Sequence, residues 1–186
     1  MNMAKVSIII VNWNRVEYLS KCLASVKGNT KYRSYEIVVV DNGSSDGSAE
    51  FVKQNYPEVK LIQNQTNLGF AKANNQAIKA CDSNYIFLLN NDTEVMEGWL
   101  TNVATLAESD ARIGIVGAKI YYTDTNYPQY CGDRIIPRNK LLAKIILATE
   151  RKRDRIKEVD FVSGAGFLIR KELFHKIGFF DEHFYL

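Results

Sequence analysis

The sequence has 186 residues, of which 46% are hydrophobic and 24% charged, and its formal net charge is +3. This composition is ordinary for a soluble globular protein with one α/β core, and the charge is too small to indicate nucleic acid binding. No apolar run is long enough to span a membrane and the N-terminus lacks a signal-peptide layout, so we expect a cytoplasmic protein.

The first ninety residues alternate between short apolar runs and amphipathic patterns. Strands are predicted at residues 6–11, 35–40, 59–62 and 85–89. Helices are predicted between them, at about 15–28, 46–55 and 71–78. Asn14 is the expected N-cap of the first helix. Strands that alternate with helices in this way predict a Rossmann-like, mostly parallel sheet with right-handed crossovers.

The second half of the chain is less regular. Its predicted helices are at about 99–107, 141–155 and 171–176, and its predicted strands are at 113–120, 159–162 and 166–169. We expect one α/β domain over residues 1–186. Because the sequence stops in an apolar aromatic run, we also expect that the chain is truncated before its natural C-terminal end.

Polar side chains follow three of the predicted strands. Asn12 ends the first strand, Asp41 ends the second, and Asn90 to Asp92 follow the fourth. In an open α/β sheet these strand ends line one crevice, where ligands bind. If the chain stays extended, Asn90 and Asp92 share a face and could hold a hard divalent cation. The alternative is a simple turn, because asparagine and aspartate are good turn formers.

Two common nucleotide-binding motifs are missing from the sequence. No Gly-x-Gly-x-x-Gly follows the first strand, which disfavours NAD, and no P-loop signature occurs, which disfavours ATP held by a Walker lysine. What remains is a nucleotide recognised by strand ends, with its diphosphate neutralised by a metal at Asp92.

Four ordered motifs resemble the inverting glycosyltransferases of family 2, and the rhamnosyltransferase-like branch is the most similar. The motifs are VSIIIVNWN (residues 6–14), VVVDNGSSDGS (38–48), NLGFA (67–71) and LLNNDT (88–93). The resemblance covers essentially the whole chain and implies the GT-A fold. It also implies transfer of a sugar from a nucleoside-diphosphate sugar to an acceptor hydroxyl, in the synthesis of a cell-surface polysaccharide.

The resemblance assigns roles to individual residues. Asn12 and Trp13 are expected near the base, and Asp41 is expected to contact the base or the ribose. The full set of expected nucleotide-sugar-binding residues is Asn12, Trp13, Asp41, Asn67, Gly69, Phe70, Lys72, Asn74 and Asn91. The acceptor is expected near Gly164 and Ala165, and is either a saccharide or a lipid-linked sugar.

The metal site departs from the family pattern. Asn90 and Asp92 occupy the positions of the family's Asp-x-Asp, which binds Mg²⁺ or Mn²⁺, so one carboxylate stands where two are usual. A less charged site should bind the metal more weakly. The general base of the family is expected beyond Leu186, and Asp181 and Glu182 are weak candidates to replace it.

Two other functions stay open. The chain could be a nucleotide-sugar-binding module without activity, because its expected base is missing. It could also be a sugar nucleotidyltransferase, although such enzymes usually carry a glycine-rich basic loop after the first strand, and Asn12-Trp13-Asn14 lacks it.

The predicted helix at 141–155 bears on location. It has an apolar stripe followed by a basic cluster, which suits peripheral contact with an anionic membrane at the inner face. An ordinary packed helix with a solvated basic end is the alternative that we favour.

Overall fold

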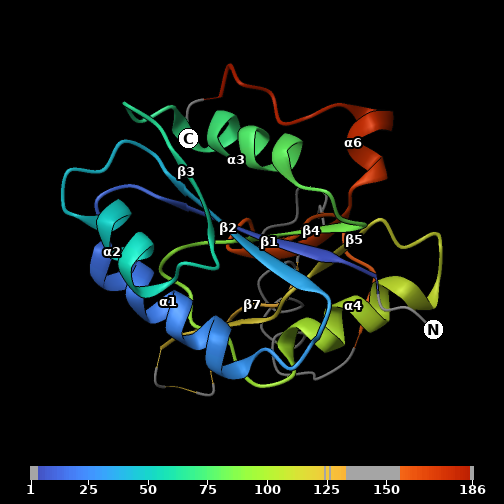
Figure 1. Cartoon of the computed structure of the whole chain (residues 1–186). Helices are drawn as coiled ribbons and strands as arrows, with labels where there is room; N and C mark the ends of the chain where they lie inside the picture. The colour runs from blue at the N-terminus through green and yellow to red at the C-terminus, as the bar shows by residue number, and fades with distance from the viewer. Residues whose placement is uncertain (1–3, 124, 126, 133–155, 185–186) are drawn as a thin grey trace, which may run out of the picture.

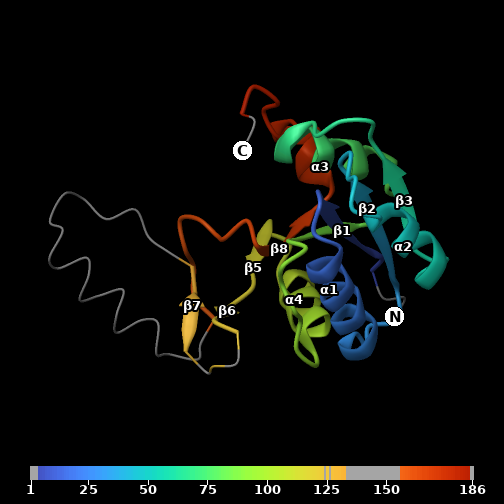
Figure 2. The same cartoon turned by 90° about the vertical axis from the view of Figure 1, so that its left-hand side faces the viewer.

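A six-stranded sheet in the order β3-β2-β1-β4-β8-β5 forms the centre of the molecule (Figure 1). The computed structural model describes residues 4–123, 125, 127–132 and 156–184. The strands of this sheet are β1 (Val6–Asn12), β2 (Tyr35–Asp41), β3 (Lys60–Gln63), β4 (Tyr85–Leu89), β5 (Ile115–Gly117) and β8 (Gly166–Arg170). A separate pair, β6 (Ile120–Tyr121) and β7 (Pro128–Tyr130), lies beside the main body (Figure 2).

The parallel half of the sheet confirms the Rossmann-like prediction. β1 pairs in parallel with β2 on one side and β4 on the other, and β2 pairs in parallel with β3. The register places Asn12 opposite Asp41 at the carboxyl ends of β1 and β2. Since β2 lies on one side of β1 and β4 on the other, the crevice between β1 and β4 is the topological switch point.

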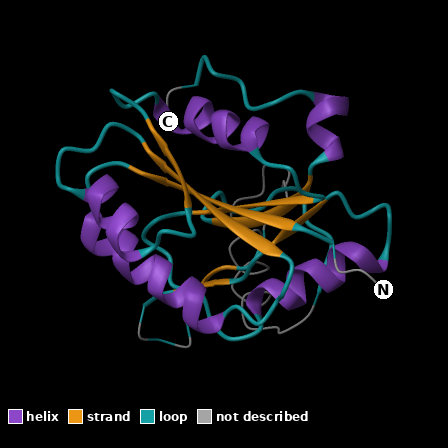
Figure 3. Ribbon diagram, in the orientation of Figure 1, coloured by secondary structure: helices purple, strands orange, loops and turns teal. Residues whose placement is uncertain are grey.

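Helices cover both faces of the sheet (Figure 3). They are α1 (Val16–Asn29), α2 (Ser48–Asn55), α3 (Gly69–Ala80), α4 (Trp99–Ser109) and α6 (Glu172–Ile177). α1, α2 and α4 lie on one face and α3 and α6 on the other, as the two separate core clusters require. The fold is therefore a three-layer α/β/α arrangement.

Alternation along the strands builds these two cores. Ile8 and Phe87 face the α1 and α4 side, whereas Ile9 and Leu88 face α3. All four side chains are at most 1% exposed. Because both faces are covered, the strands read as continuous apolar runs instead of alternating patterns.

The other half of the sheet differs from the prediction. β8 pairs antiparallel with β4, and β5 pairs antiparallel with β8. The predicted strand at 113–120 is two short strands that belong to different sheets. The predicted strand at 159–162 is wrong, since the segment holds only an isolated bridge at Phe161. The predicted helix at 141–155 lies outside the described residues.

The start of α1 also differs from the prediction. Asn14 does not cap the helix; it adopts a positive φ of 46°, and its side chain accepts a hydrogen bond from the Ser45 N–H at 2.7 Å. The first free N–H, that of Val16, is satisfied by the carboxylate of Asp46 at 2.9 Å. Asp46 also accepts the N–H of Ser48 at 3.1 Å, so one carboxylate serves the first turns of α1 and α2.

Within the part of the chain that the structure describes, no helix combines the length and the apolar content needed to cross a membrane.

Candidate functional site

An open pocket of about 450 Å³ lies at the switch point between β1 and β4. It is lined by Val11, Trp13, Arg15, Asn42, Asn67, Gly69, Phe70, Asn74, Leu88, Leu89, Asn90 and Asn91. The lining combines side-chain amides, two aromatic rings and aliphatic side chains at the base. Apolar walls with a few convergent polar groups are typical of small-molecule sites.

Most of the predicted nucleotide-sugar-binding residues are brought together here. The pocket is lined by Trp13, Asn67, Gly69, Phe70, Asn74 and Asn91 from that set. Trp13 is 52% exposed and stands at the mouth, where a flat ligand could stack on its ring. Lys72 is exposed and does not line this pocket.

Asn12 lies beneath the pocket and does not line it. Its side chain is fully buried, and its Oδ1 accepts a hydrogen bond from Asn91 Nδ2 at 2.7 Å. Because this hydrogen bond holds the side-chain nitrogen of Asn91, the side-chain oxygen Oδ1 of Asn91 remains to accept a hydrogen bond at the pocket. Asn12 therefore supports a lining residue instead of touching the space itself.

Asp41 is 3% exposed and also lies below the pocket lining. Its Oδ1 accepts the N–H of Ser44 at 3.0 Å, whereas its Oδ2 is buried and has no hydrogen-bond partner among the described residues. A buried carboxylate oxygen without a donor is costly. This orphaned atom fits a site that is completed by the N–H or O–H of a ligand.

Asn42 organises the loop that forms one wall of the pocket. It is 2% exposed, and its Nδ2 donates to Asn67 Oδ1 at 2.8 Å. Its Oδ1 accepts from Leu68 N at 3.1 Å and from Asn64 Nδ2 at 3.0 Å. The side-chain amide of Asn42 thus fixes the backbone that precedes α3. The sequence prediction did not include Asn42. Its position directly after Asp41, at a strand end, was the signal that could have found it.

A turn follows β4 at the edge of the pocket. The N–H of Thr93 donates to the carbonyl of Asn90 at 3.2 Å, so the chain is not extended here as the shared-face argument for Asn90 and Asp92 assumed. Asn90 and Asn91 line the pocket, whereas Asp92 is exposed beyond it. The described residues contain no cluster of three or more His, Cys, Asp or Glu side chains that could enclose a metal ion.

The predicted acceptor segment is connected to this turn. The N–H of Asn90 donates to the carbonyl of Ala165 at 3.0 Å. Gly164 is exposed, and a Cβ added to it would meet no atom within 4 Å. Neither residue lines the pocket; Ala165 is hydrogen-bonded to the predicted metal-binding turn, and Gly164 precedes it in the chain.

Asp181 and Glu182, the weak candidates for the base, lie outside the pocket lining. Asp181 Oδ1 accepts the N–H of His183 and contacts its Nδ1 at 2.7 Å, and the hydrogen bonds from His183 lower the pKa of that carboxyl. Glu182 Oε1 accepts a hydrogen bond from Asn75 at 3.0 Å. The carboxylate of Asp181 is therefore hydrogen-bonded within its own segment, and that of Glu182 is hydrogen-bonded to α3.

Arg15 is the one charged side chain in the lining formed by the described residues. Its guanidinium lies 5.6 Å from the centre of the Tyr18 ring, on the first turn of α1. A cation beside an otherwise uncharged pocket favours an anionic ligand. The prediction missed Arg15, although it directly follows the Asn12-Trp13-Asn14 motif.

Cys22 lies under the same turn, with its Sγ 3.6 Å from the carbonyl oxygen of Asn90. Burial, together with the smaller effect of the negative charges of Asp92 and Glu94, raises the pKa of this thiol to about 12. A neutral thiol is therefore packed against the turn that carries Asp92.

A model of glycosyl transferase family 2 matches residues 7–178. Among curated proteins, N-acetylglucosaminyl-diphospho-decaprenol L-rhamnosyltransferase from Mycobacterium tuberculosis is 25% identical over an alignment of 202 residues, covering 96% of this chain and 66% of that protein. Glycosyltransferase AglE from Haloferax volcanii is 32% identical over 126 residues, covering 65% of this chain and 41% of that protein. The chain thus spans less than two thirds of either relative.

Solved structures are similar over nearly all of the chain. Mannosyltransferase PcManGT from Pyrobaculum calidifontis, solved with GDP-Man and Mn²⁺, has a TM-score of 0.72 at 20% identity, with 98% of this chain and 49% of that chain covered. A fragment of S. aureus TarS solved with UDP has a TM-score of 0.71 at 20% identity, with 97% of this chain and 51% of that chain covered. This likeness confirms the GT-A fold. With its family model matched over residues 7–178, the chain belongs to glycosyl transferase family 2.

Proposed function

We propose that this chain binds a nucleoside-diphosphate sugar in the pocket between β1 and β4 and serves its transfer to an acceptor hydroxyl. The observation that carries the proposal is the pocket itself, which lies at the switch point and combines aromatic rings, amides and one arginine. The relatives support it, because PcManGT was solved with GDP-Man and TarS with UDP and UDP-GlcNAc.

We propose that the pocket-lining residues, together with Asp41 below them, each bind a different part of the donor. Trp13 and Phe70 offer ring faces to the base or the sugar. Asp41 offers its partnerless Oδ2 to an N–H of the base or a hydroxyl of the ribose. Arg15 is placed to offset part of the charge of the diphosphate. Each residue supplies binding and orientation before any bond changes.

A divalent metal fits this donor set, although the protein does not enclose it. Mg²⁺ is often held by one or two carboxylates together with substrate phosphates, and not by an all-protein cage. Asp92 offers one carboxylate, and Asn90 offers an amide oxygen at the same turn. We propose these two residues as the protein ligands of Mg²⁺ or Mn²⁺, which would stabilise negative charge on the leaving diphosphate when bound.

The reaction we propose is a single displacement that inverts the anomeric centre. The acceptor hydroxyl attacks the anomeric carbon from the face opposite the diphosphate, and its proton goes to a general base. Gly164 and Ala165 are the proposed acceptor side, because Ala165 is hydrogen-bonded to the Asn90 turn and Gly164 has open space beside it. We propose a saccharide or lipid-linked acceptor in cell-surface polysaccharide synthesis, in keeping with the M. tuberculosis relative.

A second candidate function is donor binding without transfer. The observation that favours it is that no carboxylate of the described residues lines the pocket, so a base within reach of an acceptor is not evident there. Donor-dependent stabilisation without sugar transfer or donor hydrolysis would identify this function.

A thermal-shift panel tests the proposed function. UDP-, GDP- and dTDP-sugars are compared, each with Mn²⁺ and with EDTA. A donor at 100 times its Kd in Mn²⁺ should stabilise the chain by about 2.7 kcal/mol, and by about 1.4 kcal/mol in EDTA, where we expect tenfold weaker binding. If no donor raises the melting temperature under either condition, the pocket is not a nucleotide-sugar site.

A further inference from the structure

The side chain of Asn75 connects α3 to the segment 178–184, which follows α6. Asn75 is 2% exposed. Its Nδ2 donates to the carbonyl of Phe180 at 2.9 Å and to Glu182 Oε1 at 3.0 Å, and its Oδ1 accepts the N–H of Phe180 at 3.1 Å. Both amide protons and the amide oxygen are therefore used.

This pattern fixes the backbone of Phe180 in both directions. The amide meets the N–H and the C=O of one residue, as a strand neighbour would, and so determines the position and the orientation of that peptide unit. Since Asn75 is almost fully buried, removing its amide would leave polar groups without partners, which is more costly than losing an exposed contact. The clamp formed by Asn75, Phe180 and Glu182 is thus a specific connection between distant parts of the chain.

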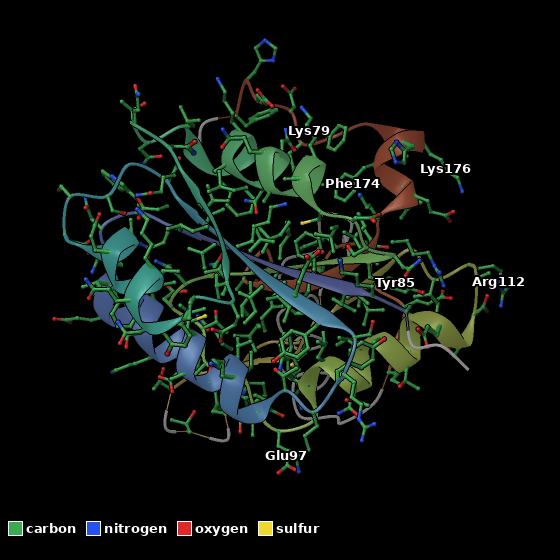
Figure 4. The ribbon with its side chains drawn as sticks, in the orientation of Figure 1. Lys79, Tyr85, Glu97, Arg112, Phe174 and Lys176 are labelled. Atoms are coloured by element: carbon green, nitrogen blue, oxygen red, sulfur yellow. The ribbon has the colours of Figure 1, made fainter. Side chains whose placement is uncertain are left out.

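The ring of Phe180 carries this connection to the pocket. It lies 6.0 Å from the ring of Phe70 in a T-shaped arrangement and 6.1 Å from the ring of Phe174. Phe70 lines the pocket, and Phe174 is the buried residue of α6. Figures 1 and 2 show the segment after α6 running along α3, and Figure 4 shows Phe174 between these two helices.

We propose that Asn75 is a positioning residue of the donor pocket. It holds the segment 178–184 against α3, so that Phe180 backs the Phe70 ring and fixes one wall of the pocket. Glu182 then serves as a partner in the clamp and not as a proton acceptor. The inference rests on the proposed function, because it assumes that the pocket receives a nucleotide.

The chemistry of the clamp predicts which substitutions break it and which restore it. Asn75→Asp removes both donors and places a carboxylate against Glu182, so it should open the clamp further than Asn75→Ala does. Combining Asn75→Asp with Glu182→Gln reverses donor and acceptor between the two side chains. This double variant should recover part of the nucleotide affinity that Asn75→Asp loses. Ser7→Ala is the matched control, because Ser7 is fully buried and hydrogen-bonded to Glu36 and Ser83 at the opposite end of β1.

The first arm of the test needs no ligand. Amide hydrogen exchange is measured on the 186-residue chain and on the Asn75→Ala and Ser7→Ala variants. Asn75→Ala should accelerate exchange both in 178–184 and at the start of α3 around Phe70, whereas Ser7→Ala should change neither. Unchanged exchange around Phe70 in the Asn75→Ala variant would overturn the proposal, whether or not the pocket binds a nucleotide.

The second arm measures the affinity for UDP, GDP and dTDP with Mn²⁺ by calorimetry. Asn75→Ala should weaken binding of the preferred nucleotide about tenfold, and Ser7→Ala should leave it unchanged. Because the effect passes through Phe70, the losses from Asn75→Ala and Phe70→Ala should not add in the double variant. Wild-type affinity of Asn75→Ala, or fully additive losses, would refute the positioning role. If the wild-type chain binds no nucleotide, the proposed function fails, and the exchange arm alone decides on the clamp.

Discussion

The proposed metal site depends on one residue, Asp92, whose carboxylate is exposed. It stands outside the pocket lining, at a turn whose two pocket-lining side chains, Asn90 and Asn91, are uncharged. A single carboxylate cannot hold a divalent cation tightly by itself, so metal and diphosphate should bind together. This arrangement would couple metal affinity to donor binding.

Asp92→Asn should therefore weaken Mn²⁺-dependent binding of a nucleoside diphosphate about tenfold, equivalent to ~1.4 kcal/mol. The melting temperature without ligand should stay the same, because the side chain is exposed. Glu94→Gln is the control, since Glu94 is an exposed carboxylate two residues away. Equal losses from both substitutions would show general electrostatics instead of a ligand at Asp92.

The thiol of Cys22 should be unreactive in the folded protein. Burial raises its pKa from 9.0 to about 12, so the thiolate is almost absent at pH 8. Since the folded pKa lies above the unfolded one, the associated stability is complete below pH 9.0 and is lost between pH 9.0 and about 12. Iodoacetamide at pH 8 should label the partly exposed Cys131 and spare Cys22, as measured by mass spectrometry. Labelling of both cysteines at similar rates would contradict the burial of Cys22.

At the scale of the elements, the side chain of Asp46 takes the capping role that the sequence predicted for Asn14. The Asp46 carboxylate reaches the first turns of α1 and α2, which follow different strands. Burial raises its pKa, but the Ser48 hydroxyl together with the N–H groups of Val16 and Ser48 outweighs burial, and the pKa is lowered. One side chain thus connects the starts of two helices.

Asp46→Ala should lower the free energy of unfolding by about 1–2 kcal/mol, as the loss of a helix cap does. Because the folded pKa is lowered, the contribution is complete above the ordinary value of 3.8 and is lost as the pH falls through the lower folded value. Urea unfolding of the wild type and of Asp46→Ala, at pH 7 and below pH 3.8, measures this difference in the free energy of unfolding. Asp46→Asn, which keeps an acceptor oxygen, should cost less at pH 7; a cost equal to that of alanine would argue against the capping role.

The loop after β2 and the loop after β3 approach closely at Gly43. A Cβ added there would lie 2.7 Å from the backbone of Thr66, and φ is +80°. Gly43→Ala should therefore destabilise the fold by about 1–3 kcal/mol and displace the loop that carries Asn67. Gly47→Ala is the matched control, because φ is +84° there but the added Cβ meets nothing within 4 Å. If both variants lose the same stability by urea unfolding, the close approach contributes nothing.

At the scale of the whole molecule, the parallel half of the fold could be predicted because each strand is buried on both faces. Such strands are continuous apolar runs, and their polar ends mark one edge of the sheet. The direction of β8 could not be predicted in this way, because an apolar run such as Gly166–Arg170 has the same composition in either direction.

The candidate site was predicted in its location but not in its internal roles. Asn12 ends β1 and Asn42 directly follows β2, yet Asn12 supports Asn91 from below the lining, whereas Asn42 lines the pocket and fixes a loop. An asparagine can donate and accept, so its partners depend on the register and on loops distant in the sequence. For the same reason the sequence did not predict the contacts of Asn75, whose hydrogen-bond partners are 105 and 107 residues away.

Calorimetric titration of the 186-residue chain with UDP, GDP and dTDP, each in Mn²⁺ and in EDTA, tests the central claim most directly. We expect saturable binding of at least one of these nucleotides in Mn²⁺, and binding about tenfold weaker in EDTA and in the Asp92→Asn variant. Absence of binding by all three nucleotides, or the same affinity in Mn²⁺ and in EDTA, would contradict a metal-assisted nucleotide-sugar site between β1 and β4.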